Sequence, residues 1–202
     1  MGADQGKLYQ DGKSCFEKGE FPQALTHFTA AGEHADSLFM LGEIYNNGNG
    51  VAVNKEHAVE YYLRSHNLGH SEPSRRLGQY YAIDKEPRDY KESFKYYSMA
   101  HERKANSATA IMLGTMLYTG TGIEVDYKRA YYYLNYANEE KNDNCDMKYL
   151  LGILNLEGKG VEKNEDLGIK LLVESYSAGN YNASYKLGHV LLYHDYLKEK
   201  IA

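Results

Sequence analysis

The chain is 202 residues long with a formal net charge of −5, and its 43% hydrophobic and 25% charged residues are typical of a folded globular protein. The acidic balance argues against non-specific nucleic-acid binding, which needs a dense basic surface. Two cysteines cannot build a disulfide framework, so we expect a reducing compartment, the cytoplasm. The longest stretch without a charge, between Lys104 and Glu124, is interrupted by polar residues and glycines, so no membrane insertion is expected.

The first 34 residues resemble the tetratricopeptide repeat, with matching residues at Gly12, Gly19, Phe21, Ala24, Phe28 and Ala31. The resemblance implies two helices, at about residues 4–17 and 22–33. Pro22 suits the first turn of the second helix, where its missing N–H group is harmless.

From residue 35 onward the dipeptide Leu-Gly recurs in register. It occurs at residues 41–42, 77–78, 113–114, 151–152 and 187–188, at intervals of 36, 36, 38 and 36 residues. A glycine within a helix costs roughly 1 kcal/mol relative to alanine, so these anchor glycines predict the close packing of two helices. The two extra residues of the third interval fall in segment 139–144, where we expect a longer exposed turn.

In three of the units the same pattern of residue types follows the anchor glycine. Two glycines predict the end of a first helix: Gly48 and Gly50, Gly120 and Gly122, Gly158 and Gly160. An N-cap residue then predicts the start of a second helix, at Asn54, Asp126 and Asn164. A small residue followed by bulky residues gives that helix one apolar face. The unit that begins at residue 71 has Asp84 and Glu86 where glycines are expected, so its loop should take a different path.

This pattern resembles the Sel1-like repeat, a longer-looped relative of the tetratricopeptide repeat. The resemblance implies an all-α fold, one continuous right-handed α-solenoid of stacked helix-turn-helix units over residues 1–202. The expected parts are a tetratricopeptide-like hairpin at 1–34, Sel1-like repeats at 35–70, 71–106, 107–144 and 145–180, and a terminal helix at 181–202. It also implies a non-catalytic adaptor or scaffold, because Sel1-like repeats mostly bridge the components of protein complexes.

Several groups that resemble reactive sites have a plainer structural interpretation. The Gly-x-Gly loops lie between helices rather than after a strand, so they are expected to be turns and not phosphate-binding loops. His66 and His70 have a spacing that can bind a metal ion, but no cysteine or carboxylate pair accompanies them. We therefore predict no catalytic residue, cofactor or metal site, and no enzymatic activity. In the run 131–133, at least one tyrosine ring should be exposed, because successive side chains on a helix point about 100° apart.

In solenoids of this kind the first helices line the concave face, and the repeat register assigns the residues that face a partner. The predicted partner-binding residues are Phe39, Glu43, Asn46, Arg75, Gln79, Ile111, Thr115, Tyr118, Tyr149, Ile153, Tyr185, His189 and Tyr193. Their aromatic and hydrogen-bonding side chains are those that peptide capture needs. The charges expected on this face, Arg75 apart, are acidic: Asp36, Glu43, Glu72, Asp146 and Glu157. The expected partner is therefore a protein or peptide that is neutral to basic and carries apolar anchors.

Two alternatives remain open. One is a regulatory subunit of an enzyme complex or an enzyme, for which His189 with Asp146 or Glu157 is the candidate cluster. The other is a self-associating structural protein that forms a homo-oligomer through its terminal helix. That helix carries an apolar run at Leu187, Val190, Leu191 and Leu192, and no second helix follows to cover it.

Overall fold

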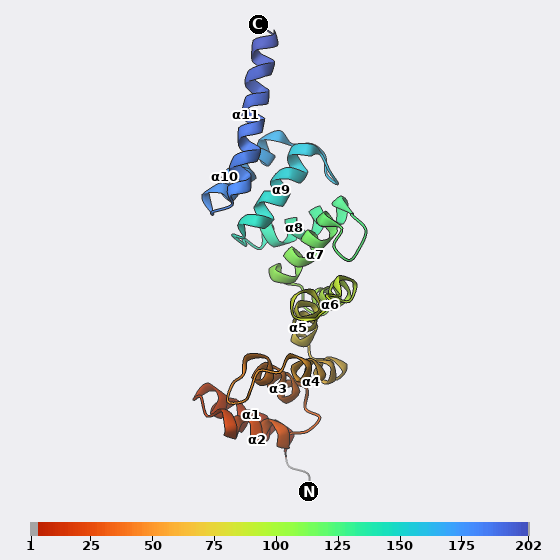
Figure 1. Cartoon of the computed structure of the whole chain (residues 1–202), viewed down its shortest axis with the longest axis vertical. Helices are drawn as coiled ribbons and strands as arrows, with labels where there is room; N and C mark the ends of the chain where they lie inside the picture. The colour runs from red at the N-terminus through yellow and green to blue at the C-terminus, as the bar shows by residue number, and fades with distance from the viewer. Residues whose placement is uncertain (1–3, 202) are drawn as a thin grey trace. The chain divides into compact units, whose positions relative to one another are not determined.

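The computed structural model describes the backbone of residues 4–201 and, within it, the side chains of residues 4–190 and 192. All regular elements in this part of the chain are helical (Figure 1), so the predicted all-α fold of repeated helical hairpins is confirmed. The chain divides into two compact units, Met1–Lys104 and Ala105–Ala202. The division falls close to the predicted boundary between the second and third repeats.

Unit 1, residues 1–104, contains three helical hairpins. The predicted N-terminal hairpin is present as α1 (Gln5–Glu17) and α2 (Phe21–Ala30). The next hairpin consists of α3 (Ala35–Asn47) and α4 (Lys55–Asn67). The third pairs α5 (Glu72–Gln79), which continues into the π-helix η1 (Tyr80–Asp84), with α6 (Tyr90–Arg103).

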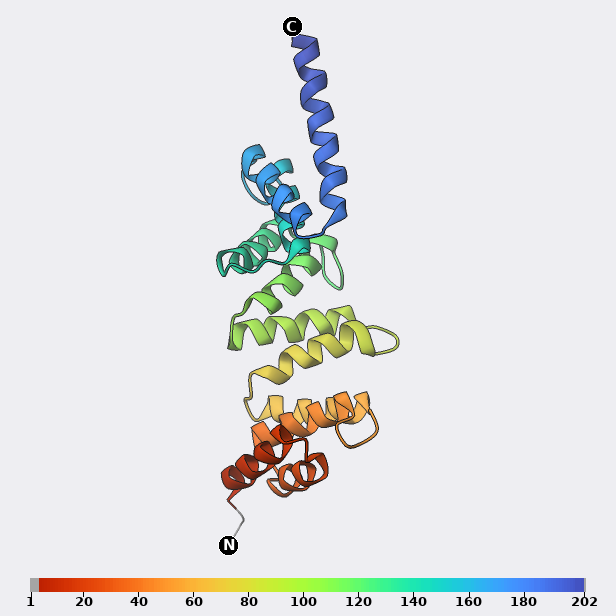
Figure 2. The ribbon, with the colours of Figure 1, turned by 90° about the vertical axis from the view of Figure 1, so that its left-hand side faces the viewer.

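Unit 2, residues 105–202, contains two hairpins and a long final helix (Figure 2). The first hairpin pairs α7 (Ser107–Thr119) with α8 (Tyr127–Glu139), and the second pairs α9 (Cys145–Glu157) with α10 (Glu165–Ser177). The connection between α8 and α9 is the longer turn expected at residues 139–144, with Lys141 and Asp143 exposed. The last helix is α11 (Tyr181–Ile201).

In three of the described hairpins, α3–α4, α7–α8 and α9–α10, the loop ends and restarts the helices as the sequence predicts. Gly48 ends α3 in the left-handed conformation, at φ 72°, and its N–H group donates to the Ile44 carbonyl. The Asn54 side chain then accepts a hydrogen bond from the His57 N–H group and caps α4. Asp126 and Asn164 cap α8 and α10 in the same way, which satisfies donors that a helix N-terminus otherwise leaves unpaired.

The third hairpin of unit 1 keeps its register without the glycine loop. The chain widens into η1 where the other first helices end at glycine. Nevertheless, the backbone N–H of the N-cap residue Asp89 donates to the Tyr81 carbonyl at 2.9 Å. The equivalent bond joins Asn54 to Tyr45 in the preceding hairpin, at 2.9 Å. The different path that we predicted is therefore confined to the loop.

Helices within a hairpin pack closely because a glycine on the first helix lies beneath a large side chain of the second. We call this contact a glycine socket. It occurs in all five hairpins of the described chain: Gly12 under Phe28, Gly42 under Tyr62, Gly78 under Tyr97, Gly114 under Leu134 and Gly152 under Leu172. A Cβ atom added to Gly114 would lie 2.6 Å from Leu134 Cγ, so a larger residue would force the helices apart. The close packing predicted from the Leu-Gly register is present at four of its five positions. At the fifth, Gly188, no atom of the described residues lies within 4 Å of an added Cβ atom.

Candidate protein-binding site

A groove in unit 2 gathers side chains from the first turns and middles of three helices. It has a volume of about 300 Å³ and lies between α7, α9 and the start of α11. We call it the amide groove, because three asparagines line it. Its lining residues are Ile111, Met112, Thr115, Asn144, Asp146, Tyr149, Leu150, Asn180 and Asn182.

Helix capping fixes the polar rim of the amide groove. The Asn144 side chain accepts a hydrogen bond from the Met147 N–H at 2.8 Å and caps α9. The Asn180 Oδ1 atom accepts from the Asn182 N–H at 2.9 Å, while its Nδ2 atom donates to Asp146 Oδ1 at 2.8 Å. These bonds hold the amides and the carboxylate in place before any ligand arrives.

The floor of the amide groove is apolar. Ile111 and Leu150 are buried and belong to the main core cluster of unit 2, and the half-buried ring of Tyr149 packs against the same cluster. Met112 is exposed and adds a flexible apolar wall. An apolar floor with a few fixed hydrogen-bonding groups above it is the usual construction of a binding site for peptides and small ligands.

Three of the predicted partner-binding residues meet in this groove: Ile111, Thr115 and Tyr149. Tyr118 lies outside its lining and contacts Tyr127 edge to face, with ring centroids 5.6 Å apart. Ile153 requires a correction, because it is only 4% exposed and packs with Leu172 in the core. The register places it on a first helix, but the second helix and α11 cover it.

The remaining predictions in unit 2 lie on α11. Tyr185 is 73% exposed, and its ring contacts the exposed His189 edge to face at 4.6 Å between centroids. The side chain of Tyr193 lies outside the described residues.

In unit 1 the predicted residues make contacts with their own neighbours. Phe39 stacks on His70, with ring centroids 4.9 Å apart, and packs with the Tyr62 cluster. Asn46 accepts a hydrogen bond from Lys55 Nζ at 2.9 Å.

Arg75 and Gln79 are half-buried residues of α5. Arg75 pairs with Glu72 on the same helix, at 3.6 Å between Nε and Oε2.

Glu43 is largely enclosed, with its side chain 13% exposed. One carboxylate oxygen accepts a hydrogen bond from the Tyr62 hydroxyl at 2.6 Å, and the other lies 2.5 Å from Arg76 Nη2. Burial, and then the Glu43 carboxylate, raise the pKa of Tyr62, so its hydroxyl stays a donor to Glu43. Glu43 therefore holds α3, α4 and α5 together.

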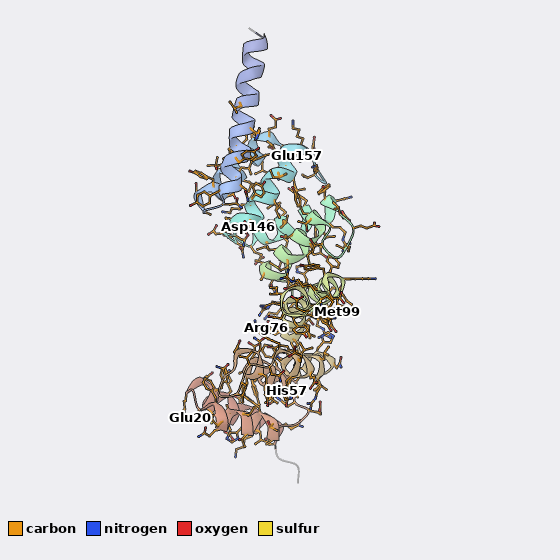
Figure 3. The ribbon with its side chains drawn as sticks, viewed as in Figure 1. Glu20, His57, Arg76, Met99, Asp146 and Glu157 are labelled. Carbon is orange, nitrogen blue, oxygen red and sulfur yellow. The ribbon has the colours of Figure 1, made fainter. Side chains whose placement is uncertain are left out.

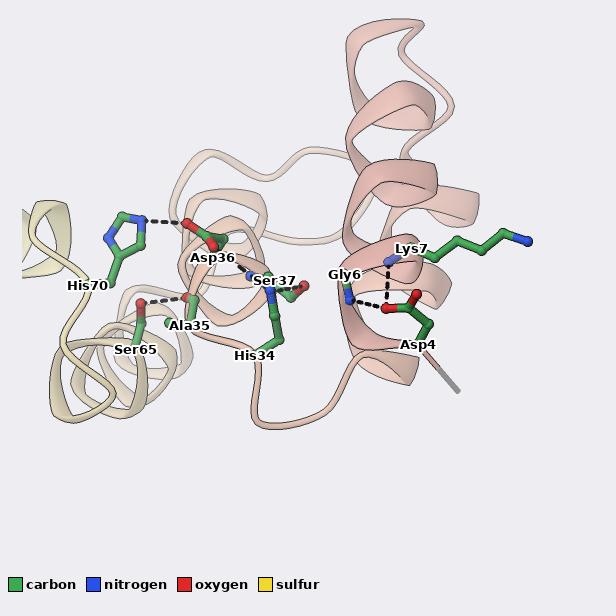
Figure 4. A network of polar contacts seen from close by, with 9 residues as sticks. All are labelled: Asp4, Gly6, Lys7, His34, Ala35, Asp36, Ser37, Ser65 and His70. Atoms are coloured by element: carbon green, nitrogen blue, oxygen red, sulfur yellow. Dashed lines mark hydrogen bonds and ion pairs between the residues drawn. The ribbon is translucent and has the colours of Figure 1, made fainter. Parts of the chain in front are cut away.

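Most of the acidic side chains expected on the binding face lie within ion-pair distance of a basic side chain. Asp36 lies 3.1 Å from His70 Nε2 (Figure 4), and Glu43 pairs with Arg76. In unit 2, Glu157 pairs with Lys159 at 2.8 Å and with Lys186 at 2.6 Å. Burial raises the pKa of the Glu157 carboxyl, but hydrogen bonds from the two lysines outweigh it and lower the pKa overall.

Asp146 differs from these residues, since no cation pairs with it in the described part of the chain. Asp146 and Glu157 occupy opposite ends of α9 (Figure 3). The rim of the amide groove therefore carries a carboxylate that no cation of the described residues pairs with.

Among the described residues, no hydrogen bond joins His189 to Asp146 or Glu157, the catalytic cluster considered above. Asp146 bonds to Asn180, Glu157 to the two lysines, and His189 contacts Tyr185. The histidine pair also has other contacts: His66 Nδ1 lies 2.9 Å from Ser74 Oγ, while His70 pairs with Asp36. Among the described residues, no group of three histidine, cysteine, aspartate or glutamate side chains is placed to hold a metal ion.

Sequence reasoning missed several lining residues: Met112, Asn144, Leu150 and Asn180. Asn144 and Asn180 stand just before α9 and α11, outside the helical offsets that the repeat register assigns. The sequence feature that could have identified them is the N-cap residue type in front of each first helix. Met112 could not be predicted, because the register turns that position away from the assumed face.

One interpretation of the tyrosines is confirmed, since Tyr132 is 63% exposed between two half-buried tyrosines. For the membrane, each helix of the described chain is too short or too polar to cross a bilayer.

Comparison with known proteins identifies the repeat. The family described as Sel1 repeat matches residues 35–70, 75–103, 107–142 and 146–180. The chain is similar in structure to c5321, a protective antigen of uropathogenic Escherichia coli with an SLR fold, at 24% identity and a TM-score of 0.75. It is also similar to a Sel1 repeat protein from Oxalobacter formigenes, at 23% identity and a TM-score of 0.74. These matches cover 93% and 89% of this chain, which spans 41% of the antigen and 74% of the Oxalobacter protein.

Proposed function

This chain belongs to the Sel1 repeat family, and we propose from that premise that it is a non-catalytic adaptor whose amide groove binds an extended segment of a partner protein. Sel1 repeat proteins are generally protein-interaction scaffolds, and the family is typically non-catalytic. The partner is a protein or peptide, and neither nucleic acid nor a cofactor takes part.

The observation that carries the proposal is the pairing of an apolar floor with preset amides in the amide groove. Asn182 is exposed at the rim, so its side chain can exchange hydrogen bonds with the backbone of an extended peptide. Ile111 and Tyr149 lie below and can receive one apolar side chain of that peptide. Affinity would then come from the buried anchor, and orientation from the amides.

The charge of the groove restricts the kind of peptide segment that can bind there. Because no cation of the described residues pairs with Asp146, a lysine or arginine of the peptide would replace water next to the carboxylate at little cost. The proposed ligand is therefore an extended segment with an apolar anchor and a nearby basic residue. An acidic segment would meet like charge at the rim.

The proposal can be tested with a library of displayed peptides selected on the full chain. Selected peptides should share the apolar and basic residues and should lose about tenfold or more in affinity for the Tyr149→Ala variant, because a central aromatic side chain is removed. Gln79→Ala provides the matched control, since Gln79 is a predicted and half-buried residue of unit 1. Peptides that bind both variants as they bind the wild type would refute the groove as the site.

A Tyr149→Ala variant that unfolds would leave the role of the ring undecided, so Asn182→Ala is the second variant. Asn182 is exposed, and its side chain makes no bond that holds the described fold. Loss of affinity with unchanged helicity is the expected result.

We propose the cytoplasm as the compartment, because Cys15 and Cys145 are both free thiols. A role as the regulatory subunit of an enzyme complex fits the same groove, with the enzyme's own segment as the bound peptide.

A further inference from the structure

The five hairpins use one packing rule for their second helices. The large residue that covers the socket is preceded four positions earlier by a small buried residue: Ala24, Ala58, Ser93, Ala130 or Gly168. Three positions after the large residue comes another small buried residue: Ala31, Ser65, Ala100, Ala137 or Ser175. The second helix therefore presents small, large and small residues on one face, and the large one fills the socket.

Backbone contacts explain why the small residues are needed. At Gly152, an added Cβ atom would lie 2.8 Å from Leu172 Cγ and 3.1 Å from the Gly168 carbonyl oxygen. In two hairpins the last small residue is a serine that donates to the first carbonyl of the first helix. These bonds run from Ser65 to Ala35 and from Ser175 to Cys145, each 2.7 Å long (the former is drawn in Figure 4).

Helix α11 has the features of a first helix, but its socket is empty. Leu187-Gly188 falls in the Leu-Gly register, and Asn180 caps the helix as Asn144 caps α9. Ala183 and Leu187 pack onto α9 and α10, so one side of α11 is covered. On the other side, nothing in the described chain lies within 4 Å of the Gly188 Cβ position.

The backbone of α11 also departs from the other first helices after the socket. In α3, α7 and α9 a left-handed glycine ends the helix and returns the chain as the second helix. α11 instead continues as a helix to Ile201 and does not fold back (Figures 1 and 2). Exposed apolar side chains accompany the empty socket, with Tyr181 at 81% and Leu192 at 71% exposure.

We infer that the Gly188 face of α11 is a docking surface for an amphipathic helix of a partner protein, which would pack there as the second helices of the hairpins pack on their first helices. Its contact face carries a small residue, then Phe, Tyr or Leu four positions later, and a second small residue three positions after that. The five internal hairpins supply the chemistry of this occupant, since each fills the same socket with that pattern. The surface uses different residues from the amide groove and a helical rather than an extended ligand.

The test uses a fluorescent peptide that copies residues 164–180 and so carries the Gly168, Leu172 and Ser175 pattern. A lactam bridge between the exposed side chains of Asp166 and Lys170 keeps it helical, because short helices are otherwise marginal in water. The full chain should bind it saturably in fluorescence anisotropy. A peptide with Leu172→Ala should bind at least about tenfold more weakly.

On the protein, Gly188→Leu should fill the socket and weaken binding of the peptide by about tenfold or more. Lys128→Leu introduces the same side chain at an exposed position of α8 and serves as the matched control. If Gly188→Leu fails to fold, Gly188→Ala, which adds one methyl group, should still reduce the affinity. Met112→Ala, at an exposed lining residue of the amide groove on α7, should leave this affinity unchanged, so failure here is separate from failure of the amide groove.

Three results would overturn the inference. The wild-type chain does not bind the bridged peptide, or Gly188→Leu binds it as the wild type does. The third overturning result is a dimer in sedimentation that Gly188→Leu abolishes, because it would assign the socket to a second copy of the chain.

Discussion

The residue directly after the anchor glycine has opposite roles in the α3–α4 hairpin of unit 1 and the α7–α8 hairpin of unit 2. In unit 1 that residue is Glu43, which is closed off between the Tyr62 hydroxyl and Arg76. In unit 2 it is Thr115, which lines the amide groove. The backbone register is the same in both cases. The side chains contributed by neighbouring helices therefore decide which residues are accessible to a partner. The same position of the repeat can either stabilise the packing of helices or bind a ligand.

The largest effect should follow from removing the ion pair between Glu43 and Arg76 in unit 1. Arg76→Met leaves the largely buried Glu43 carboxylate without its cation, which we expect to lower the free energy of unfolding by about 3 kcal/mol. Adding Glu43→Leu should recover much of the loss, since no charge is then left buried. Urea denaturation measures both variants. A negligible loss for Arg76→Met would mean that Glu43 is solvated and available to a partner.

The next effect compares two glycines of unit 2. Gly152→Ala places a methyl group against Leu172 and the Gly168 carbonyl, and such overpacking costs about 1–3 kcal/mol. The methyl group of Gly188→Ala has no described residue within 4 Å and the helix gains propensity, so this variant should be neutral or stabilising by up to about 1 kcal/mol. Thermal unfolding followed by circular dichroism distinguishes the two. Equal losses would show that the Gly188 socket is already filled.

The smallest effect is a difference in acid sensitivity between the units. Burial lowers the pKa of His66, with a further contribution from Arg103, and burial lowers the pKa of His101 below the usual 6.5. The unfolded chain then binds protons that the folded unit 1 does not, so stability present above pH 6.5 falls as the pH drops below it. In unit 2, the lowered pKa of Glu157 confers stability that is lost only below its usual 4.5.

Hydrogen exchange measures this difference, once it is corrected for the intrinsic rate at each pH. Between pH 6.5 and pH 5, protection should decrease in peptides from α4 and α6 and persist in those from α8 and α10. A His66→Gln, His101→Gln variant should reduce the decrease in unit 1. Equal decreases in both units would contradict the assignment.

Much of the fold follows from the sequence because glycine has few substitutes. The Leu-Gly register identified the sockets, and Gly48 with Asn54 marked the turn between α3 and α4, since each position has a geometric requirement that few residues meet. The π-helix at Tyr80–Asp84 could not be predicted beyond a change of path, because no residue there has so specific a requirement.

The repeat register predicted the binding residues less well than it predicted the fold. Offsets along a helix state which side a residue faces, but not what the next repeat places against it. The sequence therefore gave no sign that Ile153 is covered or that Arg76 neutralises Glu43. Asn144 and Asn180 were missed because they precede their helices.

The most direct test of the amide groove is nuclear magnetic resonance of the labelled full chain, titrated with a peptide selected from the displayed library. The account predicts shifts of the side-chain amide signals of Asn144 and Asn182 and of the Thr115 backbone amide, while the signals of Gln79 in unit 1 stay in place. Saturable binding that shifts signals of unit 1 and leaves those of Asn182 and Thr115 unchanged would contradict it.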